Sequence, residues 1–221
     1  MNKILAWHFL REDCKMRFKP DVKVKPGVEY KAKLPLVMCK NGLHASEQII
    51  DALFYAPGTV VCRVELSGRM IKNNDKICAE KRKVLWMYDA ANVLHEFACI
   101  VMERALLKER ESGREPDQRS WQVIEVKRRW LRGESSSEDL AAAWEAAWAA
   151  VWEVAWEVSW ETEWEAIWKA ALTAAKGATE VATRAATQTV AQTVAQEEYN
   201  LLLEQMIICE SAKRSLWKTE K

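Results

Sequence analysis

The stretch CKNGLHAS, residues 39–46, gathers residue types that can recognise an anion. Asn41-Gly42 favours a tight turn with left-handed backbone, and Ser46 is suited to cap a helix that follows. Gly42, His44 and Ser46 are therefore candidates for a turn-based anion site, because backbone N–H groups at a helix start point outward. The same stretch also fits a strand–turn–helix junction in which His44 is satisfied within the protein, and both interpretations stay open.

A second pattern, HEFAC, places His95 and Cys99 four residues apart on one helix face. Together with Cys39 and His44 they would complete a Cys2His2 set for zinc. However, His95 and Cys99 fall at core positions of the expected helix, and the spacing from Cys39 to His44 is not that of a standard zinc knuckle. We therefore expect no metal, and keep these four residues as the alternative.

Motifs that anchor several enzyme classes do not occur. The sequence has no GxxxxGK[ST], GxGxxG, GxSxG or HExxH, so nucleotide hydrolases, dinucleotide dehydrogenases, α/β-hydrolases and zincins lack their defining residues. Lysines cluster at 15–33 and 81–83, where they could contact nucleic acid or an acidic segment of the same chain. Because the acidic segment is already at high effective concentration, nucleic acid is not the expected partner. No cofactor is expected.

The elements that must position these residues are short near the N-terminus. Segments rich in β-branched and aromatic residues, bounded by Gly, Pro and Asn turns, predict an antiparallel or mixed sheet. These segments are residues 4–10, 28–33, 34–39, 59–66 and 82–88. Ser46 is the expected cap of a helix through Tyr55, and Asp89 of a helix to about Arg110. Together they predict an α+β domain over residues 1–110.

The second half of the chain predicts helices. Residues 111–134 fit a connector with a polar break and a short basic helix over 117–132. A capping box, formed by Ser135 with Glu138 or Ser136 with Asp139, then begins a helical tract over 135–210. Residues 211–221 form a polar tail.

Within this tract a tryptophan recurs at every fourth position. The seven residues are Trp144, Trp148, Trp152, Trp156, Trp160, Trp164 and Trp168. Four residues turn a helix by about 400°, so each indole lies about 40° further round, and the row forms a right-handed spiral instead of a heptad stripe. A ladder of like charges from Glu153 to Glu165 destabilises the isolated helix, so another interaction must compensate.

Three arrangements would cover the tryptophans. The helix pairs with copies of itself, folds back near Gly177 in a hairpin, or lies on the basic N-terminal domain; a fourth reading is a plain alanine-rich spacer. Residues 1–110 carry 20 Lys and Arg against 13 Asp and Glu (+7), whereas residues 138–176 carry eight acids against two lysines (−6). An apolar ridge of this size is typical of an interaction surface, so we expect a homo-oligomer.

The whole chain indicates a reducing, non-membrane setting. The N-terminus lacks the apolar core of a signal peptide, and the six cysteines have no short-spaced framework. No run of about 18 uncharged apolar residues predicts a membrane span. We expect reduced thiols, a cytoplasmic location and no membrane partner.

Several stretches resemble a family of uncharacterised proteins encoded by phages and bacteria. They are AWHFL, KPGVEYKAKLPLVMCKNGLHAS, ALFYAPGTVVCRVELSG, VLWMYDAANVLHEFAC and the Ala/Trp tetrads. The resemblance implies a phage or prophage setting, a bacterial host cell, and a host or phage protein as a further partner. It implies no activity.

A more distant pattern is similar to ADP-ribosyltransferase folds. A strand bearing a histidine, a Gly-to-Ser turn, a helix with a tyrosine and a further strand would map onto His8, Gly42 to Ser46, Tyr55 and 59–66. The resemblance implies NAD-dependent chemistry with His8, His44 and Tyr55 as catalytic candidates, although no glutamate follows in a Gln/Glu-x-Glu setting. Because the distinctive residues are packing residues, we favour a self-assembling binding or scaffold protein over this enzyme or a small-molecule-sequestering protein.

Overall fold

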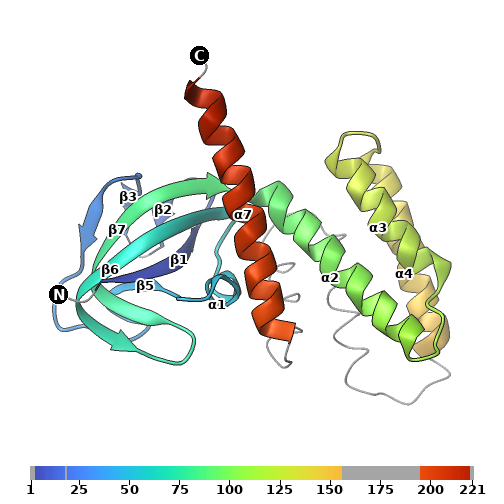
Figure 1. The fold of residues 1–221 in the computed structure, drawn as a ribbon, viewed down its shortest axis with the longest axis horizontal. Helices are drawn as coiled ribbons and strands as arrows, with labels where there is room; N and C mark the ends of the chain where they lie inside the picture. The colour runs from blue at the N-terminus through green and yellow to red at the C-terminus, as the bar shows by residue number, and fades with distance from the viewer. Residues whose placement is uncertain (1–2, 18, 156–194, 220–221) are drawn as a thin grey trace. The chain divides into compact units, whose positions relative to one another are not determined.

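The computed structural model describes residues 3–17, 19–155 and 195–219, and it divides the chain into two compact units (Figure 1). Unit 1 comprises residues 1–91 together with 193–221, and unit 2 comprises residues 92–192. The C-terminal helix therefore belongs to the same unit as the N-terminal sheet. The domain ranges expected from the sequence remain predictions. They are defined by changes in composition along the chain, whereas the two units are defined by contacts between residues.

Unit 1 is built on an antiparallel sheet with the order β1-β6-β7-β4, in which β5 also pairs with β7. Its strands are β1 (Ile4–Leu10), β4 (Glu29–Lys31), β5 (Leu43–Ala45), β6 (Val60–Lys72) and β7 (Ile77–Asp89). A separate hairpin pairs β2 (Lys15–Met16) with β3 (Lys19–Lys23). The sheet thus depends on two 13-residue strands, β6 and β7, which carry all the other pairings.

The sheet curls until β5 meets β1. The pairing of β6 with β7 shifts register after Arg63 and again after Ser67, and such irregularities bend strands. Gly68 lies at the second shift with φ +79°, a left-handed conformation that suits glycine. The backbone of Trp7 then exchanges two hydrogen bonds with Ser46, at 2.7 and 3.0 Å. We call the space enclosed by β1, β6, β7 and β5 the interior of the closed sheet.

An apolar cluster fills much of this interior. Alternation along β1 places Ala6 and Leu10 in it, and the same period places His8 on their face. Val64, Leu66 and Val84 join from the long strands, and Cys14, Met16 and Val24 pack against them beside the β2–β3 hairpin. The members of the cluster are buried. A histidine on this face lies in apolar surroundings.

The opposite face of the sheet is covered by helices. Trp7 and Phe9 on β1 are buried on this side, near helix α1 (Ile49–Phe54). Helix α7 (Ala195–Thr219) packs beside α1, and Figure 1 shows it crossing the sheet. Its Leu203 and Ile207 are fully buried. The outer core therefore joins residues about 200 positions apart in the chain.

A polar contact fixes α7 to the start of α1. The residue before α1, Gln48, makes no side-chain capping bond, and the free N–H of Ile50 instead donates to Oδ1 of Asn200 at 3.2 Å. Asn200 is itself buried. The N–H groups of a first helical turn need an acceptor, so α7 supplies the cap that the local sequence lacks.

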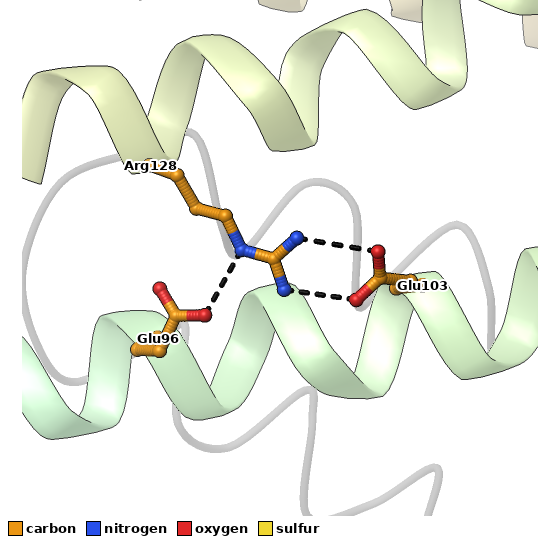
Figure 2. A network of polar contacts seen from close by, with 3 residues as sticks. All are labelled: Glu96, Glu103 and Arg128. Carbon is orange, nitrogen blue, oxygen red and sulfur yellow. Dashed lines mark hydrogen bonds and ion pairs between the residues drawn. The ribbon is translucent and has the colours of Figure 1, made fainter.

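Unit 2 contains α2 (Ala91–Glu111), α3 (Gln118–Leu131) and α4 (Ser137–Ala155). Arg128 on α3 joins both ends of a segment of α2, donating from Nε to Glu96 at 2.9 Å and from Nη1 and Nη2 to Glu103 at 3.2 and 2.9 Å (Figure 2). This two-pronged ion pair fixes α3 against α2, because a guanidinium fork is geometrically specific. None of the described helices has the length and apolar character needed to cross a membrane.

The first residues of the tryptophan tract contribute to unit 2. Ser136 and Asp139 exchange hydrogen bonds at 2.9 and 3.0 Å, which confirms the second of the two predicted capping boxes. Trp144 packs on a cluster that includes Cys99, Met102 and Ile124. Its ring centroid lies 6.3 Å from that of Trp148. The side chain of Trp152 and the whole of Trp156, Trp160, Trp164, Trp168 and Gly177 lie outside the described residues.

Two expectations about the N-terminal segments are wrong. Residues 34–39 form a loop and not a strand, because Pro35 has no N–H to pair and the amide of Asn41 donates to the carbonyls of Lys33 and Pro35. Ser46 does not cap α1, since its backbone pairs with Trp7 and the helix begins at Ile49. By contrast, β1, the helix after Asp89 and the helix before Gly133 are confirmed.

The buried contacts of α7 lead to the first prediction. Replacing Leu203 with Ala should destabilise unit 1 by about 2–5 kcal/mol, the usual cost of a cavity in a core. Replacing Leu201, which is 57% exposed on the same helix, should change stability by less than about 0.5 kcal/mol. Urea unfolding of the full chain, followed by circular dichroism, measures both. Equal effects of the two substitutions would show that α7 is not part of the core.

Candidate functional site

A pocket of about 530 Å³ opens in unit 1. It is lined by residues of β1, by the β2–β3 hairpin, by Tyr30 of β4, by the loop and strand from Cys39 to Ser46, and by Tyr55 and Lys76. The volume is in the range of small-molecule sites. The pocket reaches the interior of the closed sheet, because His8 and Arg82 also line it.

Among the described residues, the charged side chains that line the pocket are all cationic. No Asp or Glu is among the described residues that line it, whereas six basic side chains do so: Lys15, Arg17, Lys31, Lys40, Lys76 and Arg82. Two of them have acidic neighbours outside the lining: Lys31 lies 3.4 Å from Glu80, and Lys76 lies beside Asp75. An excess of positive charge nevertheless remains, and a concave surface concentrates it.

Arg82 is the most deeply buried of these cations. Only 3% of its surface is exposed, and its Nη1 donates to the carbonyl of His44 at 2.8 Å. Its Nε is enclosed and has no hydrogen-bond partner. Burial lowers the pKa of Arg82 to about 10, so the group still carries its charge at neutral pH. Arg82 is therefore a buried cation with part of its guanidinium unused.

The two pocket histidines have different roles in the structure. Nε2 of His44 accepts from the backbone N–H of Cys39 at 3.0 Å, and a hydrogen bond to the backbone of Gly42 engages the ring again. His44 thus holds the turn together. The His8 ring makes no hydrogen bond to any residue within the described ranges. Burial, and then the charge of Arg82, hold the pKa of His8 well below its usual value.

The turn between these residues tolerates little change. Gly42 has φ +143°, and a Cβ there would lie 2.2 Å from Sγ of Cys78. Cys39 adopts φ +62°, which is uncommon for a residue with a side chain. Glycine at position 42 is therefore required both by the backbone and by the close approach of β7.

A polar network lies at the rim of the pocket. The Tyr55 hydroxyl donates to Asp75 and accepts from Nζ of Lys76, which lies 3.0 Å away and 4.2 Å above the ring. Burial and the bond to Asp75 raise the pKa of Tyr55. Asp51 lies near this network, and burial followed by the charge of Asp75 raises its pKa to about 6. Tyr55 is thus a partner in a fixed network and holds its proton more tightly than usual.

The structure brings together the residues that the sequence singled out in the N-terminal half. His8, Gly42, His44, Ser46 and Tyr55 all line the same pocket, although their chemical roles remain predictions. Ser46 lines it from the junction of β5 with β1, since the observed helix α1 begins three residues after the expected cap, at Ile49.

The four residues of the alternative metal site are divided between the units. Cys39 and His44 belong to unit 1, and His95 and Cys99 belong to unit 2. Within the described ranges no three His, Cys, Asp or Glu side chains gather in a metal-binding arrangement. His95 packs edge-on against Trp130, and burial followed by the charge of Lys127 lowers its pKa to about 4. It is a core histidine.

Sequence reasoning missed Arg82, Asp75 and Asp51. In the sequence, Arg82 is one member of the lysine-rich cluster KRK and has no feature that distinguishes it. In the structure, Arg82 and Val84 are buried, whereas Lys81 and Lys83 are more exposed. The period-two alternation of the strand could have found it, because Arg82 and Val84 share the inward phase. Asp51 and Asp75 are separated in the sequence, and no spacing or alternation pattern predicts that they lie close together.

The part of the chain that holds the pocket is similar to a domain found in other proteins. Residues 4–96 match the model of a domain of unknown function, DUF7666. The match covers less than half of the chain, and every residue that lines the pocket lies within it. No curated protein and no solved structure matches the chain.

The raised pKa of Asp51 gives a prediction about pH. Its carboxyl titrates near 3.8 when exposed and at about 6 in the folded protein, so the folded state binds the proton more tightly between these values. The stability that this proton contributes is present below about pH 4 and is lost as the pH rises through 6. Asp51→Asn cannot ionise, so its unfolding free energy should gain on the parent from pH 4 to 7. Denaturant titrations of both proteins across that range measure the difference, and a constant difference would contradict the assignment.

Proposed function

We propose that unit 1 is a binding module for a small anionic molecule, held in the pocket around Arg82. The observation that carries the proposal is the six cationic side chains of a concave site that no described Asp or Glu lines. Cations that serve only solubility project into water, whereas Arg82 is buried and incompletely bonded. Burying a charge without a partner is costly, so an anionic ligand would supply the negative charge and the hydrogen-bond acceptors that Arg82 lacks.

The pocket also offers apolar contacts for the rest of the ligand. Leu10, Met16 and Val22 line it together with the cations, and the volume of about 530 Å³ suits a molecule of metabolite size. A charged group near Arg82 would fix the orientation, and an organic portion would contact these side chains. This function corresponds to the small-molecule-sequestering alternative.

Anion binding is tested with the full chain. Inorganic phosphate, pyrophosphate or NAD should raise the melting temperature by several degrees at concentrations far above the dissociation constant, beyond the effect of sodium chloride at equal ionic strength. Lys40→Gln should weaken the binding measured by calorimetry, because it removes one lining charge. Lys108→Gln, an exposed cation of unit 2, is the matched control and should bind as the parent does. A panel in which no anion exceeds chloride would refute the proposal.

An ADP-ribosyltransferase-like enzyme is the second candidate for the same pocket. It is favoured by the convergence of His8, His44 and Tyr55, the three residues that the fold resemblance selects. Against it stand the bonds of His44 to the turn and the absence of a carboxylate among the described residues of the lining. The NAD arm of the panel separates the two candidates, since a binding module retains NAD intact and an enzyme releases nicotinamide.

We further propose that the tryptophan tract assembles the protein into an oligomer of several helices. Trp144 packs on a cluster that includes Met102 and Ile124, and its ring centroid lies 6.3 Å from that of Trp148, so helix α4 begins the tract by packing an indole within unit 2. Further tryptophans on the same four-residue spiral would meet partners from several directions. The resemblance to phage and bacterial proteins adds the proposal that this assembly acts in a bacterial cytoplasm on a host or phage protein.

Self-association is tested by replacing tryptophans of the tract other than Trp144 and Trp148, the two whose contacts the structure describes. Replacing Trp152, Trp156, Trp160 and Trp164 with Ala should keep the helical circular dichroism and lower the mass measured by light scattering. Each indole buries on the order of 200 Å² at about 25 cal/mol per Å², so partial burial of four is a large loss. The double variant of Trp144 and Trp148 is the control that destabilises unit 2 instead. A monomeric parent would exclude assembly and favour the fold-back hairpin.

A further inference from the structure

The proposed function leaves open which group of the ligand reaches the interior of the closed sheet. Resting on that function, we infer that Arg82 and His8 form a subsite for the phosphate group of a phosphate monoester. The inference depends on which guanidinium edge is free, on what could neutralise it, and on what His8 can do.

The free edge of Arg82 is the one that binds oxyanions in pairs. Nη1 is bonded to the carbonyl of His44, while Nε is enclosed without a partner. Nη2 shares an edge with Nε and has no acceptor among the residues that the structure describes. Nε and Nη2 therefore present two parallel N–H donors, the arrangement that holds two oxygens of one anion.

Among the described residues, no neighbouring carboxylate neutralises this charge. The groups that favour the charged form of Arg82 are Cys62 and Tyr30, and neither is a carboxylate. Burial raises the pKa of the Cys62 thiol to about 12, so it is uncharged at neutral pH. The Tyr30 hydroxyl is engaged by the backbone, because it accepts from the N–H of Lys25 at 2.8 Å and donates to the carbonyl of Lys23 at 3.3 Å. A water could accept from Nε but could not supply a negative charge.

His8 supplies a further donor to the same place. It lies on the interior face of β1 and lines the pocket with Arg82, and its ring has no protein hydrogen bond within the described ranges. The other pocket histidine is unsuited to this role, because His44 already bonds to Cys39 and Gly42. Burial, and then the charge of Arg82, hold the pKa of His8 low, and an anion on Arg82 would offset the second of these effects.

The number of oxygens and charges favours phosphate over a carboxylate. The Arg82 edge takes two oxygens, and a tetrahedral phosphate has a third that can reach His8, whereas both oxygens of a carboxylate are then used. A phosphate monoester carries a charge of about −1.5 to −2 at neutral pH, which matches a lining with an excess of cations better than a single charge. The fourth oxygen of the phosphate is the ester oxygen, which connects it to the organic portion of the ligand.

The test uses the full chain labelled with ¹⁵N at histidine, so that only three imidazole rings give signals: those of His8, His44 and His95. His8→Gln assigns the signal of His8. Inorganic phosphate and ribose 5-phosphate should shift that signal saturably and leave His95 unmoved, and acetate at equal ionic strength should not. An unmoved His8 signal at saturating phosphate in the parent protein overturns the inference without reference to any variant.

Substitutions then locate the anion. Arg82→Lys keeps a cation but loses the paired edge, so calorimetry should show binding of ribose 5-phosphate weakened at least about tenfold. Lys83→Gln, the adjacent and exposed position of β7, is the matched control and should stay within about twofold of the parent. If phosphate binds but only Lys40→Gln weakens it, the subsite is refuted and the anion-binding module stands. If no anion binds, both the phosphate subsite and the anion-binding module are refuted.

Discussion

The paired hydrogen bonds between Trp7 and Ser46 are the constraint on which the pocket depends. They bring β5 beside β1, and a sheet that would otherwise have an open edge encloses an interior. The bends that make this closure possible come from the irregular register of β6 and β7. Once the sheet is closed, inward-facing side chains of distant strands meet, so His8 of β1 and Arg82 of β7 share one space although 74 positions separate them.

Secondary structure could be predicted from the sequence where it depends on interactions between residues close together in the chain. The strand of residues 4–10, the helix after Asp89 and the capping box of Ser136 with Asp139 follow from alternation and capping chemistry, which act over a few residues. The loop at 34–39 could not be read in this way. Its hydrophobic residues resemble a strand, and its conformation is imposed by the side chain of Asn41.

The candidate site was predicted in part for a related reason. His8, His44 and Tyr55 stand out by residue type, so they could be selected before it was known that one pocket contains them. Arg82 differs from its lysine neighbours only in the direction of its side chain, and direction depends on the pairing of the strand. The division between a structural His44 and an unbonded His8 depends on hydrogen bonds to Cys39 and Gly42 that no spacing rule contains.

The DUF7666 match covers only part of unit 1, because unit 1 also contains the C-terminal helix α7. The match ends at residue 96, yet the outer face of the sheet is completed by Leu203 and Ile207, and the first turn of α1 is capped by Asn200. α1 in turn leads to Tyr55 at the rim of the pocket. The chain between α4 and α7 therefore leads from unit 2 to unit 1. Residues outside the DUF7666 match therefore hold in place α1, the element that leads to Tyr55 at the rim of the pocket.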